Sequence, residues 1–148
     1  EGKMTVGFGC DHAGFALKEE LKPFVEGLGY EVKDYGTFSA EAVDYPKFGF
    51  AIGRAVAAGE VRFGIAICGT GIGISIAANK VPGVRAALCH DTFSAHSSRE
   101  HNDANILAIG ARVIGTELAK EIVKTWLAAE FLGGRHLRRV QMLEEGRH

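Results

Sequence analysis

The segment from Ile65 to Ile76 constrains the fold most, because an apolar stretch is broken by glycines and then resumes. The run Phe63–Cys68 is typical of a fully buried strand, and Ile74–Asn79 suits a short helix. A glycine-rich turn between a strand and a helix exposes backbone N–H groups at the positive end of the helix dipole. The segment therefore predicts an anion-binding turn beside Cys68, although a tight turn next to an inert buried cysteine would have the same sequence. The turn carries three glycines, Gly69, Gly71 and Gly73.

The same order of strand and helix repeats along the chain. Short apolar runs predict strands at Met4–Gly9, Tyr30–Asp34, Phe63–Cys68, Val84–Cys89 and Ile106–Ile109. Helical patterns follow these strands, the clearest one starting at Thr116, and a final helix is predicted over Arg135–Glu145. This alternation predicts an α/β fold in which a five-stranded parallel sheet has helices on both faces. Ligands bind such sheets at the carboxyl ends of the strands, where Asp11, His12 and Arg112 would join the glycine turn.

Length, charge and cysteine content exclude several classes of protein. A chain of 148 residues suits one domain, expected over residues 4–148, with Met4 as the natural start and residues 1–3 an addition ahead of it. The net charge of −1 gives no general attraction for nucleic acid, and no apolar run is long enough to cross a membrane. Three cysteines without metal-ligand spacing indicate free thiols in a cytoplasmic protein, and no metal site is expected.

Spacing also excludes familiar motifs at the glycine turn. The dinucleotide fingerprint needs glycine or alanine where this chain has Ile74 and Ile76, and the lysine of a P-loop is absent. A cysteine phosphatase has an arginine six positions after its nucleophile, where Ile74 stands. Cys68 remains usable as a general base, since a helix N-terminus favours its thiolate and the nearby amides would stabilise an oxyanion. With the hydroxyl of Thr70, these groups suit removal of a proton next to a carbonyl, which yields an enediolate.

Basic side chains near the C-terminus form a second candidate group. Arg135 and Arg139 lie at i and i+4 of the predicted final helix, so that two guanidinium groups on one face could bind a phosphate. A solvated basic helix would explain the same pattern. His101 stands in a polar stretch before a strand, where a structural and a catalytic histidine both fit.

Five motifs in register give the chain a family resemblance. It resembles the RpiB/LacAB sugar-phosphate isomerase family, and within it the type B ribose-5-phosphate isomerases, from Met4 to about Leu143. The matching segments are Gly9–Gly14, Asp44–Pro46, Cys68–Gly73, Arg99–Asp103 and Gly133–His136. The resemblance implies a Rossmann-like α/β/α sandwich with a C-terminal helix. It also implies reversible conversion of ribose 5-phosphate to ribulose 5-phosphate in the pentose phosphate pathway, without metal or cofactor.

The resemblance further implies a role for each residue of the glycine turn. Cys68 would be the base that moves a proton between C2 and C1 of the sugar. Thr70 would assist proton transfer between the two oxygens. The amides of the turn, at Gly69, Gly71 and Gly73, would hold the enediolate together with Asn102. With these roles, the turn would bind the reacting end of the substrate rather than its phosphate.

The remaining roles follow from the same resemblance. His101 would open the furanose ring with Asp11, and Tyr45 would line the sugar site. The phosphate would be held by His12, Arg112, Arg135 and Arg139. The active protein would be a homodimer, paired into a tetramer in some members, and a monomer would be nearly inactive. His101, Asn102 and Arg112 would reach the site from the second subunit.

Three other functions share part of this pattern. A six-carbon isomerase acting on allose or galactose 6-phosphate would need only a slightly larger site. A non-catalytic sugar-phosphate binding module would keep the phosphate-binding residues without needing Cys68 or His101. A redox-sensing protein would need Cys68 exposed beside a resolving cysteine.

Overall fold

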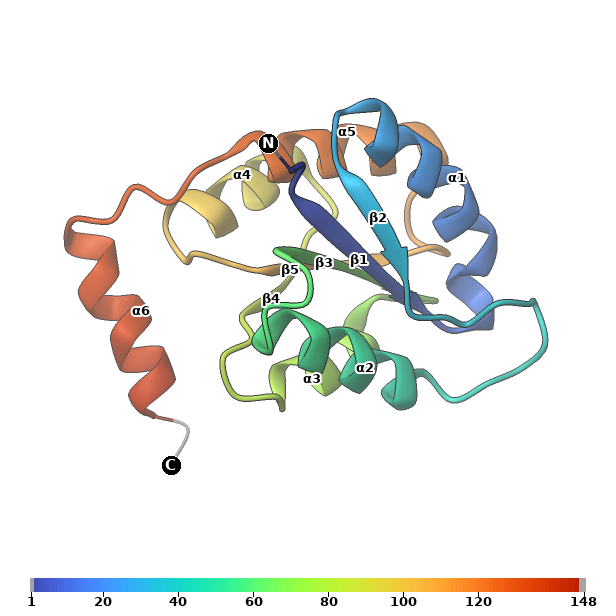
Figure 1. The fold of residues 1–148 in the computed structure, drawn as a ribbon, viewed down its shortest axis with the longest axis horizontal. Coiled ribbons are helices and arrows are strands. Elements are labelled where there is room, and N and C mark those ends of the chain that lie inside the picture. Colours follow the sequence, from blue (N-terminus) through green and yellow to red (C-terminus); the bar gives the residue numbers. More distant parts are fainter. Residues whose placement is uncertain (1, 147–148) are drawn as a thin grey trace.

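The computed structural model describes residues 2–146, in which all the strands form one parallel sheet (Figure 1). The strands are β1 (Thr5–Cys10), β2 (Glu31–Asp34), β3 (Phe63–Cys68), β4 (Ala86–Leu88) and β5 (Ile106–Gly110), in the spatial order β2-β1-β3-β5-β4. The helices are α1 (Phe15–Gly27), α2 (Tyr45–Ala57), α3 (Ile72–Asn79), α4 (Thr92–Glu100), α5 (Thr116–Ala128) and α6 (Arg135–Glu145), and a 3₁₀ turn, η1, covers His12–Gly14. The predicted α/β class and parallel sheet are confirmed.

Two helical layers cover the sheet. Helices α1, α4 and α5 lie on one face and α2 and α3 on the other, as Figure 1 shows. Each face has its own apolar core. The first core includes Trp126, which is fully buried, meets the Phe63 ring edge to face at a centroid distance of 5.3 Å, and donates a hydrogen bond from Nε1 to Ser98 Oγ. The second core is built around Ile52 and Ile74. Burial on both faces explains why β3 is a continuous apolar run.

The strand order decides where a ligand can bind. The chain leaves β1 for β2 on one side and then returns to place β3 on the other side, so the strand order reverses between β1 and β3. Parallel register brings Cys10 opposite Ile67 and Cys68 opposite Gly110. The carboxyl ends of three neighbouring strands therefore meet beside the glycine turn.

The observed bounds differ from the predicted ones mainly at an edge strand. The predicted strand Val84–Cys89 shortens to Ala86–Leu88, because β4 pairs only with β5 over three residues. Asp44 occupies the N-cap position of α2 but makes no side-chain cap hydrogen bond. Asp91 caps α4, and its carboxylate accepts a 2.6 Å hydrogen bond from Ser94 N.

Helix α6 stands clear of the two layers, at the left of Figure 1. Val140 is its one buried residue within the described range, whereas Leu137, Met142 and Leu143 remain about half exposed. Arg85 ties the helix to the body, since its Nη1 lies 2.7 Å from Glu144 Oε2 and its Nε donates to Asp103 O. Among the described residues, no helix is both long and apolar enough to cross a membrane.

Candidate active site

The loop after β3 surrounds the sulfur of Cys68. The side chain is almost fully buried, and its Sγ accepts a hydrogen bond from Gly71 N at 3.2 Å. Thr70 Oγ1 accepts a hydrogen bond from Ile72 N at 3.2 Å. Since Thr70 is exposed, its hydroxyl proton remains available to a ligand. Because α3 begins at Ile72, the N–H groups of its first turn have no carbonyl partner one turn earlier. Sulfur, hydroxyl and amide donors thus share one loop.

Glycine is required at the centre of this loop. Gly71 has φ +79°, the left-handed region that side chains disfavour. A Cβ built on Gly71 would lie 2.6 Å from Leu88 Cδ1 and 2.8 Å from the carbonyl carbon of Ile109. Gly110 in β5 lies on the other side of this contact and has no room for a side chain, because a Cβ there would lie 2.5 Å from the Thr70 carbonyl. The loop therefore packs directly on the end of β5.

Two large side chains flank the loop. The ring of Tyr45, 40% exposed, lies against Gly73, where an added Cβ would approach its Cε1 to 2.5 Å. The guanidinium of Arg112 lies beside Gly69, whose Cβ would be 3.2 Å from Nη1. Arg112 N also donates a 2.9 Å hydrogen bond to Gly69 O. Backbone pairing thus places Arg112 at the glycine turn of its own chain, and the expectation that it reaches the site from a second subunit stays a prediction.

Asp11 and His12 lie at the end of β1, beside β3. Asp11 N donates to Ile67 O at 3.2 Å, and Asp11 Oδ1 accepts hydrogen bonds from Ala13 N and Gly14 N. His12 Nδ1 accepts a 3.1 Å hydrogen bond from Val43 N. Since the accepting nitrogen carries no proton, Nε2 of the neutral His12 ring is the donor, available to an anionic ligand.

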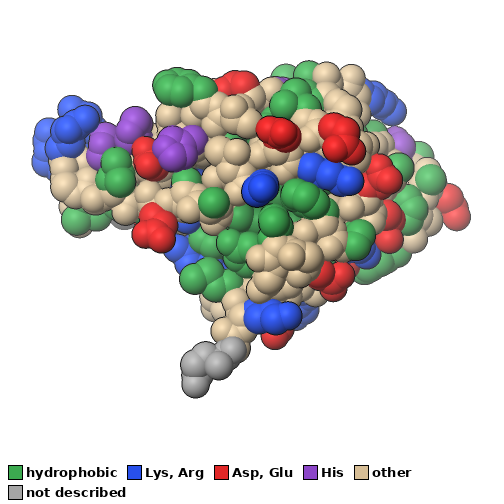
Figure 2. All heavy atoms as spheres, turned by 90° about the horizontal axis from the view of Figure 1, so that it is seen from above, with side chains coloured by type: hydrophobic (Ala, Val, Ile, Leu, Met, Phe, Trp, Pro, Cys, Tyr) green, Lys and Arg blue, Asp and Glu red, His purple; other side chains and the backbone are tan. Residues whose placement is uncertain are grey.

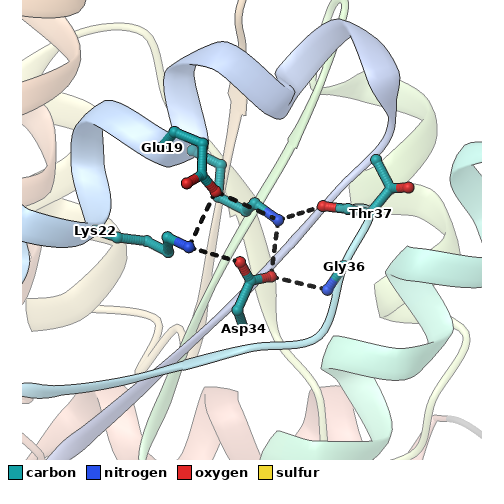
Figure 3. Close-up of polar contacts among 6 residues, drawn as sticks. Glu19, Lys22, Asp34, Gly36 and Thr37 are labelled. Atoms are coloured by element: carbon teal, nitrogen blue, oxygen red, sulfur yellow. Dashed lines mark hydrogen bonds and ion pairs between the residues drawn. The ribbon is translucent and has the colours of Figure 1, made fainter. Parts of the chain in front are cut away.

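A buried lysine anchors the loop that reaches His12. Lys18 is fully buried, and its Nζ contacts Asp34 Oδ1 at 2.7 Å and also donates to Thr37 O. Figure 3 shows the Asp34 carboxylate between these groups, with Lys22 Nζ at 2.9 Å and Gly36 N at 2.8 Å. Burial opposes ionisation of Asp34, but the two lysines and the Gly36 amide outweigh it and lower the pKa of that carboxyl. The network fixes the start of the segment that leads to Val43 and Tyr45.

The other predicted residues gather at the opposite edge of the sheet. His101 and Asn102 follow α4 and precede β5, and both are exposed. The rings of His101 and His136 stack at a centroid distance of 4.4 Å, which places the start of α6 beside them. Figure 2 shows histidine and Lys/Arg side chains together at the end of the molecule from which α6 extends. Arg135 and Arg139 are exposed on that helix.

The strand length keeps the two groups apart within one chain. Cys68 pairs with Gly110 at the end of β5, whereas His101 lies before its start at Ile106. Four steps of roughly 3.3 Å separate these ends by about 13 Å, beyond the reach of a hydrogen bond. The structure therefore brings Cys68, Asp11, His12, Tyr45 and Arg112 together, and separately groups His101, Asn102, Arg135 and Arg139.

The other two cysteines differ from Cys68. Burial raises the pKa of Cys10 to about 11 and that of Cys89 to about 11, so both thiols stay protonated at neutral pH. Both lie in the apolar core rather than in a turn of amides. Among the described residues, no cluster of three or more His, Cys, Asp or Glu side chains could hold a metal ion.

Two residues near the site were not singled out by the sequence. His90 Nε2 accepts a 2.9 Å hydrogen bond from Gly110 N and so supports the backbone that packs on Thr70. Its position directly after β4, at the carboxyl edge, was the available signal. Lys18 follows the first site motif but resembles an ordinary charged residue of an amphipathic helix, and only the fold shows its burial.

Comparisons with known proteins show to which family the chain belongs. The family described as Ribose/Galactose Isomerase matches residues 6–143. The chain belongs to the ribose/galactose isomerase family. It is 54% identical to ribose-5-phosphate isomerase B of Escherichia coli (strain K12), over 93% of each chain.

Solved structures of the same family share the fold. The ribose-5-phosphate isomerase B of Clostridium thermocellum matches with a TM-score of 0.95 and 58% identity, over 96% of each chain. The type B ribose 5-phosphate isomerase of Trypanosoma brucei matches with a TM-score of 0.95 and 42% identity, over 97% of this chain and 99% of that one. The predicted family, the Rossmann-like fold and the isomerase assignment are confirmed, while the roles of individual site residues stay predictions.

Proposed function

We propose that the protein interconverts ribose 5-phosphate and ribulose 5-phosphate through a cis-enediolate. The observation that carries the proposal is the loop after β3, where the Cys68 sulfur, the Thr70 hydroxyl and the first-turn amides of α3 converge. Family members at 54% and 58% identity carry this activity in their names. Residues 4–148 would form the isomerase domain, of which residues 147 and 148 lie outside the described range.

The proton transfer follows from the parts of this loop. As a thiolate, Cys68 removes the proton from C2 of the open aldose, and the carbonyl oxygen at C1 takes up the negative charge. The resulting enediolate carries negative charge on oxygen, which the amides of Gly69, Gly71 and Gly73 stabilise. Thr70 passes a proton between O1 and O2, and Cys68 returns its proton to C1. The reaction is balanced without an external oxidant, metal or cofactor.

The other residues bind the substrate or open its ring. Because His12 Nδ1 accepts a hydrogen bond, Nε2 remains as the donor of that ring, and Arg112 adds a positive charge at the same edge, so both suit the phosphate. Tyr45 lines the sugar site beside Gly73. Arg135 and Arg139 would complete the phosphate site, and His101 would protonate the ring oxygen while Asp11 accepts the C1 hydroxyl proton.

These assignments need two copies of the chain. His101, Asn102, Arg135 and Arg139 lie at the amino edge of the sheet, while Cys68 lies at the carboxyl edge. A homodimer in which the amino edge of one subunit meets the carboxyl edge of the other joins them twice, as two-fold symmetry requires. Compared with the sequence-based expectation, Arg112 moves to the Cys68 side and the α6 arginines move to the partner side. A tetramer would be a pair of such dimers.

Subunit mixing tests this arrangement. Cys68→Ala and His101→Ala chains are each expected to be inactive alone as homodimers. When they are mixed in equal amounts and allowed to exchange, half of the dimers become mixed, and each mixed dimer has one intact site of two. About a quarter of the wild-type activity should return, measured as ribulose 5-phosphate formed. No recovery, despite exchange shown by a size-tagged subunit, would refute the shared site.

Substrate choice is the second part of the proposal. The family description covers ribose and galactose, so a six-carbon sugar phosphate is the alternative. Comparing kcat/KM for ribose 5-phosphate and allose 6-phosphate decides between them, and a higher value for the latter would overturn the assignment. A wild type that binds these phosphates without turning them over would be a non-catalytic binding module. The pentose phosphate pathway and the cytoplasm are the setting we propose for the five-carbon reaction.

A further inference from the structure

The ring of His136 stacks on that of His101, and this stack has no role in the reaction described above. The two rings lie at a centroid distance of 4.4 Å and an interplanar angle of 16°, which is a parallel stack rather than an edge contact. His101 ends α4, and its backbone N–H donates to Ser97 O at 2.8 Å. The backbone of His101 is thus fixed by α4, while its side chain is exposed and meets α6 through His136.

Helix α6 is held in place at both ends. Near its C-terminus, Arg85 pairs with Glu144 at 2.7 Å and also donates to Asp103 O, two residues after His101. At its N-terminus, the ring of His136 rests on His101. Since α6 makes few other buried contacts, these two attachments fix where its side chains lie relative to the end of α4.

The charges around the pair favour a neutral His136. Desolvation, and then the positive charges of His101 and of two arginines of α6, lower the pKa of His136, and Glu100 opposes them. A neutral partner adds no second positive charge beside His101 when that ring is protonated. The stack therefore restricts the rotation of the His101 ring without repelling its imidazolium form.

We propose that His136 is a positioning residue, which holds the imidazole of His101 in the orientation used to open the furanose ring. The inference rests on the proposed function, because it assigns ring opening to His101. Ring opening breaks the bond between C1 and the ring oxygen and forms the C1 carbonyl. It delivers a proton to the ring oxygen from His101 and removes one from the C1 hydroxyl. A donor that rotates freely would meet the ring oxygen less often, whereas proton transfer at Cys68 would be unaffected.

The substrate chemistry separates these two steps. In ribulose 5-phosphate the phosphate occupies the C5 oxygen, so this ketose cannot close to a furanose and binds in its open form. In D₂O, Cys68 can exchange a C1 proton of ribulose 5-phosphate for deuterium without any ring step. The ratio of deuterium incorporation to net turnover of ribose 5-phosphate therefore reports on ring opening alone.

The experiment measures this ratio in His136→Ala, His136→Phe and the wild type. We expect His136→Ala to lower turnover of ribose 5-phosphate about 10- to 100-fold, since misorientation loses part of the roughly 10²–10⁴-fold contribution of general acid catalysis. Its deuterium exchange should stay close to that of the wild type, so the ratio rises by the same factor. His136→Phe keeps an aromatic face for the stack and should recover most of the turnover.

The same assay provides a control variant and the results that would contradict the inference. His96→Ala removes another exposed histidine of α4, whose Nε2 pairs with Glu100 at 3.0 Å, and should leave the ratio unchanged. Equal losses of exchange and turnover in a folded His136→Ala protein, or no loss of turnover, would overturn the inference. If thermal melting shows that His136→Ala is unfolded, His136→Gln against His136→Phe decides in its place. A wild type without turnover or exchange would instead refute the proposed function.

Discussion

Replacing Gly71 with alanine should destabilise the protein in two ways, by backbone strain and by steric overlap at the candidate active site. At φ +79°, any L-residue costs about 1–2 kcal/mol more than glycine. The new Cβ would also lie 2.6–2.9 Å from Leu88 Cδ1, the Ile109 carbonyl carbon and Gly110 N, two of which are backbone atoms that cannot rotate away. Overpacking of this kind costs about 1–3 kcal/mol more, so Gly71→Ala should lose about 2–5 kcal/mol of unfolding free energy.

Gly29 provides a matched control for the strain. It has φ +104°, yet a Cβ there would meet no atom within 4 Å. Gly29→Ala should therefore lose only the strain of about 1–2 kcal/mol. At roughly 3 °C per kcal/mol for a chain of this size, the melting temperature should fall by about 3–6 °C in Gly29→Ala and about 6–15 °C in Gly71→Ala. Differential scanning calorimetry measures both.

The two variants should differ more in activity than in stability. Gly71 N donates to Cys68 Sγ, and displacing this loop moves both the sulfur and the amides that we propose to stabilise the enediolate. Loss of one oxyanion donor costs about 10²–10³ in kcat, so Gly71→Ala should fall by at least that factor at a temperature where it is folded. Gly29→Ala should keep wild-type kcat. Equal melting temperatures and equal kcat values in the two variants would refute the packing argument.

Three further predictions concern stability. Because the folded pKa of Asp34 is lowered, its contribution to stability is present above the unfolded pKa and is lost as pH falls. Asp34→Asn removes the carboxylate 2.7 Å from the buried Lys18 ammonium and should cost about 3–5 kcal/mol at pH 7. The difference from wild type in urea titrations should shrink at acid pH. Asp91→Ala removes the acceptor of Ser94 N and should cost about 1 kcal/mol; an unchanged urea midpoint would contradict the cap. Trp126→Ala should cost about 3–5 kcal/mol, and a loss below 1 kcal/mol would show that the core around it can collapse.

Local patterns predicted the sheet well, because each strand is bounded by signals within a few residues. Phe63–Cys68 and Arg135–Glu145 have the bounds that the sequence predicted. The edge strand β4 was overestimated, since its pairing depends on how much of β5 remains available beside it. Asp44 stands at an N-cap position, but its side chain makes no cap hydrogen bond. Residue type alone cannot show whether a residue at such a position makes this bond.

The candidate site was predictable as a list of residues but not as an arrangement. The turn at Cys68 is local in sequence, so its geometry followed from its glycines. The position of Arg112 beside the glycine turn depends on a backbone bond to Gly69, 43 positions earlier in the chain, and no motif encodes it. Likewise, the burial of Lys18 depends on Asp34 and Thr37, which come from a different segment.

The position of His101 and Asn102 at the start of β5 also bears on how such a chain can evolve. In most parallel α/β proteins the carboxyl edge of the sheet changes with function, while the amino edge needs only to fold. Under the proposed function the amino edge carries reactive side chains as well, so drift at the ends of α4 and α6 would be constrained by chemistry rather than by packing. A monomeric relative of this fold would tolerate loop insertions at the amino edge of its sheet. In this protein, we expect such insertions to be selected against at both edges of the sheet.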